Sequence, residues 1–264
     1  MENITNNENA ILEWINLGHE YVDLGEYKKA IKCYKKALLF EPDNTKILNY
    51  IGKAFHKNGK LSDAIDYFKE VLINDLENLD AWINLAEIYR TLDDSHNEIK
   101  CYKEIFRLNA GNNTILSNLA LAYNNIENFE KEIECWERIV ENNPKDFDAW
   151  ISLGLAYSNM GNTKKETECW ENVVLLDPMD ENGWYNLALA HKRYGNFSKV
   201  IEYCKKVVSL NNKNIDGWFL MGITYEKINK REKAILCFKM VLNLDPNDKE
   251  AQYHLQDLNL LHEK

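Results

Sequence analysis

The side chains best suited to chemistry are glutamates and cysteines that stand three residues apart in the middle of the chain. At this spacing a carboxylate and a thiol lie on one side of a helix, where both could ligate a metal ion. Two ligands cannot close a tetrahedral site, however, and successive pairs are separated by 34 residues. We therefore expect no metal site, and we interpret the glutamates as long side chains that carry their carboxylates past the helices into water. The pairs are Glu98 and Cys101, Glu132 and Cys135, and Glu166 and Cys169.

Other patterns typical of catalysis or cofactor binding are missing from the sequence. The six histidines include no pair at metal-ligand spacing. The sequence also has no glycine-rich phosphate loop, no nucleophile elbow and no H-E-x-x-H motif. We predict that the chain is not an enzyme and has no catalytic residue, no cofactor and no metal.

The elements that carry these residues follow a period of 34 residues, which repeats seven times from Ile11 to Asp248. In each unit the fourth position is Trp or Leu, the seventh is apolar, the eighth is Gly or Ala, and the eleventh carries a ring. This spacing places large side chains and one small residue on a single helical face. A fixed period of this length predicts a solenoid of stacked helix pairs.

The second half of each unit indicates where the helices end. Position 15 is Gly in four units, and Gly supplies the left-handed conformation that ends a helix; the other three units have Asp93, Glu127 and Asn229 there. The last residue of every unit is Asn or Asp, the side chains preferred as N-caps of a following helix. All four prolines stand two residues before such a cap, where the preceding helix has to stop. Each unit is therefore predicted to be a helix, a tight turn, a second helix and a cap.

The cysteines are not expected to form a disulfide framework in this arrangement. Five of the six occupy position 23 of their units. Packed helices are separated by roughly 8–10 Å, which exceeds the ~7 Å between Cα atoms that a disulfide can bridge. We interpret them as small, reduced packing residues of a cytoplasmic protein. They are Cys33, Cys101, Cys135, Cys169, Cys204 and Cys237.

The repeat resembles the tetratricopeptide repeat family. WINLGHEY (14–21) carries the family's Trp, Leu, Gly/Ala and Tyr of a first helix, and AIKCYKKALLFEP (30–42) carries the pattern of a second helix. The resemblance implies an all-α, right-handed α-solenoid, or superhelix, of seven helix-turn-helix units. Residues 1–10 would be an N-terminal lead-in and residues 249–264 a C-terminal capping helix. Position 20 departs from the family, because the three middle units have Glu where the family has a small residue. The predicted units are 11–44, 45–78, 79–112, 113–146, 147–180, 181–214 and 215–248.

The same resemblance implies a binding surface on the concave side, lined by positions 2, 5, 6, 9 and 12 of the first helices. An Asn amide offers a donor and an acceptor together, which matches the N–H and C=O of an extended peptide. In several family members, asparagines of this kind hold a peptide backbone. The alternative is that Asn is simply common at this position of the repeat. Position 6 holds Asn16, Asn84, Asn118 and Asn186, and it holds Tyr50 in the second unit.

Selection among peptides would come from the flanking positions. The second unit contributes Lys46, Asn49 and Lys53, a basic patch in an acidic protein. Units five to seven contribute apolar side chains that the predicted core does not require, and an exposed apolar stripe usually marks a binding surface. The alternative is that neighbouring units bury these side chains against each other. The apolar residues are Ile151, Leu155, Tyr185, Leu189, Phe219 and Ile223.

The composition narrows the class of partner. The formal net charge of −10 argues against nucleic acid as a ligand, because phosphate contacts need a basic surface. The sequence shows neither an N-terminal apolar leader nor an apolar run of about 18 residues. We therefore expect neither export nor a membrane partner. We predict a cytoplasmic protein–protein interaction module that binds an extended peptide or a helix of a partner in its groove, as a monomer or a weak homo-oligomer. A self-assembling structural scaffold and a regulatory or adaptor subunit of an enzyme on another chain remain the alternatives.

Overall fold

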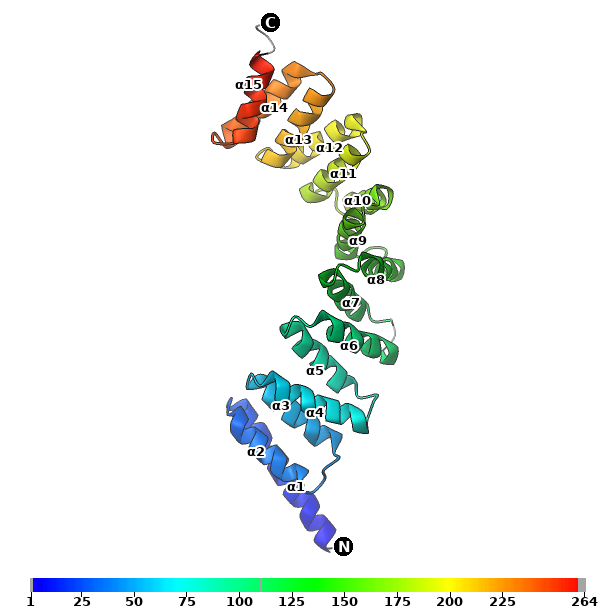
Figure 1. Cartoon of the computed structure of the whole chain (residues 1–264), viewed down its shortest axis with the longest axis vertical. Coiled ribbons are helices and arrows are strands. Elements are labelled where there is room, and N and C mark those ends of the chain that lie inside the picture. The colour runs from blue at the N-terminus through cyan, green and yellow to red at the C-terminus, as the bar shows by residue number, and fades with distance from the viewer. Residues whose placement is uncertain (1, 110, 261–264) are drawn as a thin grey trace. The chain divides into compact units, whose positions relative to one another are not determined.

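The computed structural model describes residues 2–109 and 111–260, and over these residues the chain is all-α, without strands. The helices form two compact bodies, Met1–Asn128 and Phe129–Lys264. Within each body, helices that follow one another in the chain pack side by side, as Figure 1 shows. The predicted fold class, an all-α solenoid of helix pairs, is confirmed at this level.

The first body holds seven helices, and each of them packs against the next. The first helix is longer than the rest: the predicted lead-in, residues 1–10, is helical from Glu2 onward. The helices are α1 (Glu2–Asp23), α2 (Tyr27–Leu38), α3 (Thr45–Lys57), α4 (Leu61–Asn74), α5 (Leu79–Thr91), α6 (Ser95–Leu108) and α7 (Asn113–Asn125).

The second body holds the remaining described helices, which also pack in chain order. The helices that open each unit in this body begin 34 residues apart, and the same holds in the first body for α3, α5 and α7. The helices are α8 (Phe129–Asn142), α9 (Phe147–Asn159), α10 (Thr163–Leu176), α11 (Glu181–Arg193), α12 (Phe197–Leu210), α13 (Ile215–Lys227), α14 (Arg231–Leu244) and α15 (Lys249–Leu260).

The predicted turns and caps are confirmed residue by residue. At position 15, φ lies between +71° and +75° for the four glycines and between +54° and +57° for Asp93, Glu127 and Asn229. This left-handed conformation closes the first helix of every unit, at a steric cost where the residue is not Gly. Every last residue of a unit accepts a backbone N–H of the following helix through its side chain. These caps are Asn44, Asn78, Asn112, Asp146, Asp180, Asn214 and Asp248.

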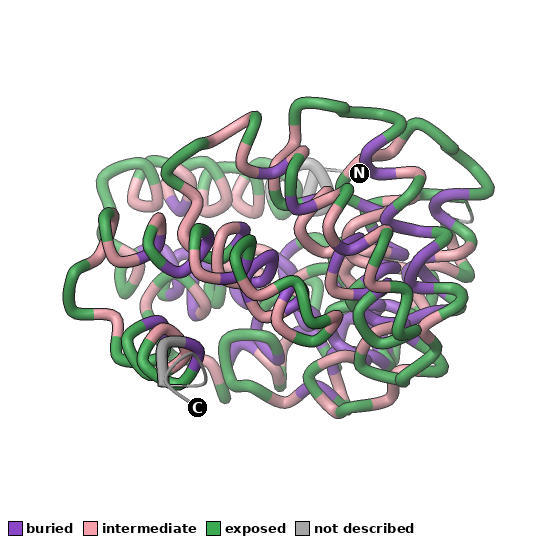
Figure 2. Tube along the Cα trace, turned by 90° about the horizontal axis from the view of Figure 1, so that it is seen from above, coloured by how far each residue is buried: buried purple, intermediate pink, exposed green. Residues whose placement is uncertain are grey.

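The small residue at position 8 makes room for the ring at position 24 of the same helix pair. A Cβ placed on Gly52 would lie 2.7 Å from Cε1 of Phe68, and one on Gly222 would lie 2.9 Å from Cε1 of Phe238. Both phenylalanine rings are completely buried. The two helices of a pair can therefore approach closely, and the core runs between them. Figure 2 shows buried stretches along the helices and exposed stretches at the turns.

The large residue at position 4 has a second role that the sequence pattern did not indicate. The indole Nε1 of Trp82 donates to the carbonyl oxygen of Leu76 at 2.9 Å, six residues earlier. Trp150, Trp184 and Trp218 make the same bond at 2.9–3.0 Å. Gln252 replaces the indole in α15 and donates to Pro246 at 2.8 Å. Each bond fixes the loop that joins one unit to the next.

The glutamates at position 20 are buried, so the prediction that they reach past the helices into water is wrong. Glu98, Glu132 and Glu166 are only 3%, 5% and 2% exposed. Arginines come to the carboxylates instead: Arg90 Nε lies 2.8 Å from Glu98 Oε1, and Arg193 Nη2 contacts Glu166 Oε1. Both arginines remain half-exposed. Glu132 Oε1 accepts a hydrogen bond at 3.4 Å from the indole Nε1 of Trp136, which lies one turn further along the same helix.

The last helix, α15, packs against α14. Its Ala251 and Leu258 belong to the buried core of units six and seven, and Leu255 packs against that core. These three residues are spaced by four and three positions in the sequence, so they share one side of the predicted capping helix. The imidazole of His254 stacks on Phe238 at 4.9 Å between ring centroids and lies 2.8 Å from Glu226 Oε2.

Candidate functional site

The candidate site is the set of side chains at positions 2, 5, 6 and 9 of the first helices, which we call the first-helix face. In the first body it lies on α1, α3, α5 and α7, and in the second on α9, α11 and α13. These positions share one side of each helix because they are spaced by three or four residues. The core positions 4, 7, 8 and 11 lie on the opposite side of each helix.

The position-6 asparagines stay accessible. Asn16 is exposed, while Asn84, Asn118 and Asn186 are partly exposed. Asn84 Nδ2 donates to the carbonyl of Asp80 at 2.6 Å, and Asn186 Nδ2 donates to the carbonyl of Asn182 at 2.9 Å. Each bond runs back four residues along its own helix and fixes the direction of the amide. Within the part of the chain that the structure describes, neither amide oxygen accepts a hydrogen bond.

Tyr50 interrupts this series because it packs on the neighbouring unit. Its ring lies 4.7 Å from that of His19 and 5.5 Å from that of Tyr34, measured between centroids. The Tyr34 hydroxyl is 2.9 Å from His19 Nδ1, and burial raises the pKa of Tyr34 to about 12. These three rings form a packed aromatic cluster, in which Tyr50 stays partly exposed.

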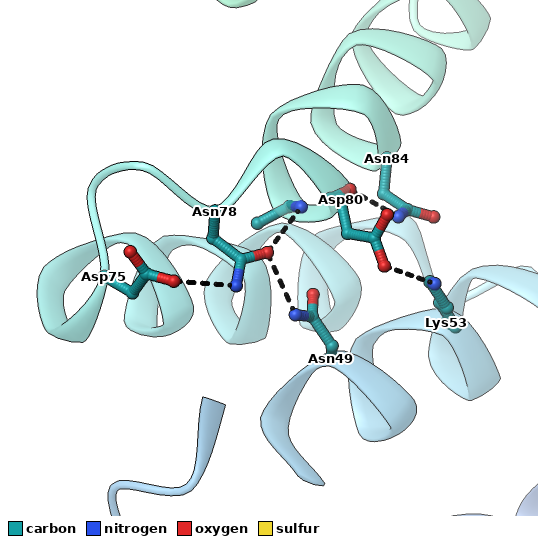
Figure 3. A network of polar contacts seen from close by, with 7 residues as sticks. Asn49, Lys53, Asp75, Asn78, Asp80 and Asn84 are labelled. Atoms are coloured by element: carbon teal, nitrogen blue, oxygen red, sulfur yellow. Dashed lines mark hydrogen bonds and ion pairs between the residues drawn. The ribbon is translucent and has the colours of Figure 1, made fainter. Parts of the chain in front are cut away.

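Asn49 is not available to a ligand, which corrects its assignment to the binding surface. Its side chain is buried, and Nδ2 donates to Asn78 Oδ1 at 3.1 Å. The same oxygen of Asn78 caps α5 by accepting from Ala81 N, and Asp75 holds the other end of the Asn78 amide at 3.0 Å (Figure 3). Asn49 therefore joins one unit to the N-cap of the next.

The basic patch of the second unit is partly neutralised. Lys53 Nζ lies 3.3 Å from Asp80 Oδ2, and Figure 3 shows this pair beside Asn84. Both side chains remain well exposed, at 43% and 67%, so the pair contributes little to stability. Lys46 is exposed in the first turn of α3. The three polar residues Lys53, Asp80 and Asn84 thus lie together on the first-helix face.

The apolar stripe of units five to seven is mostly packed between neighbours. Tyr185, Leu189, Phe219 and Ile223 are partly buried against the core of units six and seven, and Ile151 is partly buried against the core beneath α10 and α11. Leu155 is the exception, with 49% of its surface exposed. For the other five side chains, burial between units accounts for part of their apolar character.

Three exposed apolar residues of the first-helix face were not among the predicted binding residues. One is Leu12, at position 2 of the first unit, with 57% exposed. Ile83 stands at position 5 with 46% exposed, and Leu121 stands at position 9 with 54% exposed. Ile83 and Leu121 occupy the same positions as Ile151 and Leu155. The signal was in the period itself, because apolar residues at positions 5 and 9 recur in the third and fourth units as well.

The cysteines have no exposed thiolate to offer. All six are free and buried, and burial raises the pKa of Cys101, Cys169 and Cys204 to about 12. Burial also raises the pKa of Cys135 and Cys237 to about 11. Their thiols therefore stay protonated near neutral pH and pack as small apolar groups.

Among the residues that the structure describes, no group of three or more His, Cys, Asp or Glu side chains is arranged to hold a metal ion. No helix in these ranges is long and apolar enough to cross a bilayer.

Family models place the repeat. Models described as tetratricopeptide repeat match residues 79–112, 182–214 and 215–248 and residues 135–167, and a TPR repeat model matches residues 18–59. Together these segments cover more than half of the chain, so it belongs to the tetratricopeptide repeat family. Repeats of this family form protein–protein interaction modules and are generally non-catalytic. No curated protein matches the chain significantly.

Solved structures share the fold at low sequence identity. A chain in the structure of Naa15/Naa10 bound to HypK-THB is 16% identical with a TM-score of 0.74, over 94% of this chain and 38% of that one. This chain therefore spans well under half of that relative. The C-terminal part of a TPR repeat-containing protein from Cytophaga hutchinsonii is 17% identical with a TM-score of 0.70, over 91% and 99%. YrrB, described as a TPR protein with an unusual peptide-binding site, is 16% identical with a TM-score of 0.56, over 70% and 95%.

Proposed function

We propose that the chain binds an extended peptide segment of a partner protein along the first-helix face, with the position-6 asparagines holding the peptide backbone. It would act without catalytic activity of its own and in the cytoplasm. In the first body the remaining binding residues would be Lys46, Lys53, Ile83 and Leu121, and in the second body Leu155. Lys53 is partly exposed and the other four are exposed.

The observation that supports this proposal best is the orientation of the asparagine amides. In Asn84 and Asn186 one N–H of the side-chain amide donates to a carbonyl of its own helix. This bond fixes the amide, so that its second N–H and its oxygen remain for a ligand. A peptide backbone needs one acceptor and one donor at such a point. An amide that is already fixed loses little side-chain entropy on binding. YrrB, which shares the fold, is described as having an unusual peptide-binding site, and this supports the proposal.

The test uses twelve-residue peptides selected from a random display library against the whole chain. The variant Asn84→Ala/Asn118→Ala removes two amides from the first body. Each lost hydrogen bond should weaken binding by about 0.5–1.5 kcal/mol, so the affinity should fall by about five- to a hundredfold. Helical content and melting temperature should stay nearly unchanged, because both side chains are partly exposed.

Asn172→Ala is the matched control. Asn172 Nδ2 makes the same local bond, to the carbonyl of Glu168 at 2.8 Å, but on the second helix α10. Peptide affinity should not change in this variant. Equal affinities of wild type and the Asn84→Ala/Asn118→Ala variant for every selected peptide would refute backbone binding by the asparagines.

A further inference from the structure

A crevice recurs where the second helix of one unit meets both helices of the next. In the second body one such crevice, of about 260 Å³, lies among α8, α9 and α10. Another, of about 380 Å³, lies among α12, α13 and α14. The two are lined by equivalent positions of the repeat, with Trp150, Leu153 and Tyr157 in one and Trp218, Met221 and Tyr225 in the other. These positions lie on the core side of the first helices, away from the first-helix face.

The residue at position 23 differs between these two crevices and the equivalent places in units two and six. It is Cys169 in the first crevice and Cys237 in the second. Tyr67 and Tyr203 occupy position 23 in units two and six. The Tyr67 ring stacks on Phe55 at 5.4 Å, and the Tyr203 ring lies 5.7 Å from that of Trp184. In units two and six a large tyrosine ring thus packs beside the first helix, at the position where a cysteine lines the two crevices.

The two open crevices differ in the charge of their rims. Around the first, Glu137 accepts from the Tyr157 hydroxyl and lies 3.9 Å from Lys165 Nζ. Glu168 also lies 3.9 Å from Lys165. The chain thus supplies its own carboxylates to the lysine and the tyrosine of this crevice.

The crevice among α12, α13 and α14 lacks those carboxylates. Lys205 stands in place of Glu137, and Leu236, which is 63% exposed, stands in place of Glu168. Lys233 Nζ lies over the ring of Tyr225 at 5.6 Å from its centroid. Within the described ranges, neither Lys205 nor Lys233 is paired with a carboxylate, and the Tyr225 hydroxyl makes no hydrogen bond. The segment 199–240 has nine Lys or Arg against four Asp or Glu, although the whole chain is acidic.

We propose that this crevice is a second binding site, which takes a large apolar side chain of a partner peptide next to an Asp or Glu of the same peptide. The apolar side chain would lie on Trp218, Met221 and Leu236. The partner's carboxylate would occupy the place that Glu137 has in the other crevice, between the lysine at position 19 and the tyrosine hydroxyl. The volume of about 380 Å³ is at the lower end of the range for ligand pockets, and buried apolar anchors of this kind carry most of the affinity of peptide interfaces.

The test fills the crevice with a pair of residues that the chain already packs elsewhere. Tyr225→Phe/Cys237→Tyr reproduces Phe55 and Tyr67 of the second unit. Random twelve-residue peptides are selected by display on the wild-type chain, and their affinities are measured for the wild type and for the filled variant. We expect selected peptides with a large apolar residue beside Asp or Glu, whose affinity falls by about tenfold or more in the filled variant.

Two other variants sharpen the result. Lys205→Glu introduces a carboxylate at the position that Glu137 has in the other crevice. It should lower the affinity for the same peptides, and the decrease should be smaller at high salt. Tyr157→Phe/Cys169→Tyr fills the other crevice and should leave their affinity unchanged. Thermal melts report whether each variant is folded, and Lys205→Glu tests the site without any change in the core.

The proposal is overturned if no apolar-acidic peptide is selected, or if such peptides bind the filled and the Lys205→Glu variants as tightly as the wild type. These outcomes differ from those that test the first-helix face. Peptides that depend on Asn84 and Asn118 should bind equally well to the filled variant.

Discussion

At the scale of single residues, the middle units are distinguished by a carboxylate where the family has a small side chain. Glu98 and Glu166 are buried, and half-exposed arginines pair with them from neighbouring first helices. The sequence showed the glutamates but not their partners. Arg90 precedes Glu98 by eight residues within one unit, whereas Arg193 follows Glu166 by 27 residues from the next unit. Repeat spacing does not reveal partners that differ from unit to unit.

The Arg193–Glu166 pair gives a prediction about stability. Arg193→Ala leaves a buried carboxylate unpaired, so the free energy of unfolding should fall by about 2–3 kcal/mol; the value lies below that of a fully enclosed pair because water reaches the arginine. Arg193→Ala/Glu166→Ala restores the family's small residue and should be more stable than Arg193→Ala alone. Urea unfolding of the single and double variants measures this difference. A double variant less stable than Arg193→Ala would contradict the account.

His191 gives a prediction about pH. It occupies the ring position of the sixth unit and is buried, with no hydrogen-bond partner for either ring nitrogen among the described residues. Burial, followed by the nearby Lys199, lowers the pKa of His191 below its ordinary value of 6.5. The folded state therefore disfavours the protonated ring. Stability from this residue is complete above about pH 6.5 and is lost as the pH falls toward the lower folded pKa.

His191→Phe removes this dependence and reproduces the Phe55–Tyr67 pair, because Tyr203 already lies 5.4 Å from the ring of His191. The variant should gain about 1 kcal/mol or more at neutral pH, since two buried polar atoms without partners are removed. Its stability should also decrease less than that of the wild type between about pH 6.5 and 5. Thermal melts of both proteins across this range provide the measurement. Parallel pH profiles would show that His191 does not titrate as described.

At the scale of helices, the sequence predicted most of the fold. The left-handed residues and the Asn and Asp caps end and begin helices through local backbone hydrogen bonds, so they are readable from sequence alone. The bonds from Trp82 and its equivalents to a carbonyl six residues earlier are also local. They were missed because the pattern reads Trp only as an apolar residue.

The last helix, α15, gives a prediction at this scale. It packs on α14, where its His254 stacks on the completely buried Phe238, and Ile235 and Leu242 lie partly buried against the same core. Deleting residues 249–264 exposes these side chains, and terminal repeats without a polar outer helix associate. Sedimentation velocity should show larger species for the truncated chain and a lower melting temperature. A monomer with undiminished stability would show that α15 is not a structural cap.

At the scale of the whole molecule, the repeat fixes which positions form the first-helix face but not which of them remain open. Asn49 is used to hold the next N-cap, and Phe219 is packed on a neighbouring helix. Both outcomes depend on how closely two units approach each other. A 34-residue period does not specify this distance. The exposed residues Leu12, Ile83, Leu121 and Leu155 are the apolar side chains of this face that remain for a partner.

The most direct test of peptide binding along this face is site-specific photocrosslinking to the display-selected peptides that require Asn84 and Asn118. A photoreactive benzoylphenylalanine replaces Ile83 or Leu121 on the first-helix face. The control positions are Ile73 and Leu39, which are 83% and 80% exposed on or beside second helices of the same body. We predict crosslinks from Ile83 and Leu121 and only background from Ile73 and Leu39. Crosslinks mainly from Ile73 and Leu39 would contradict the account.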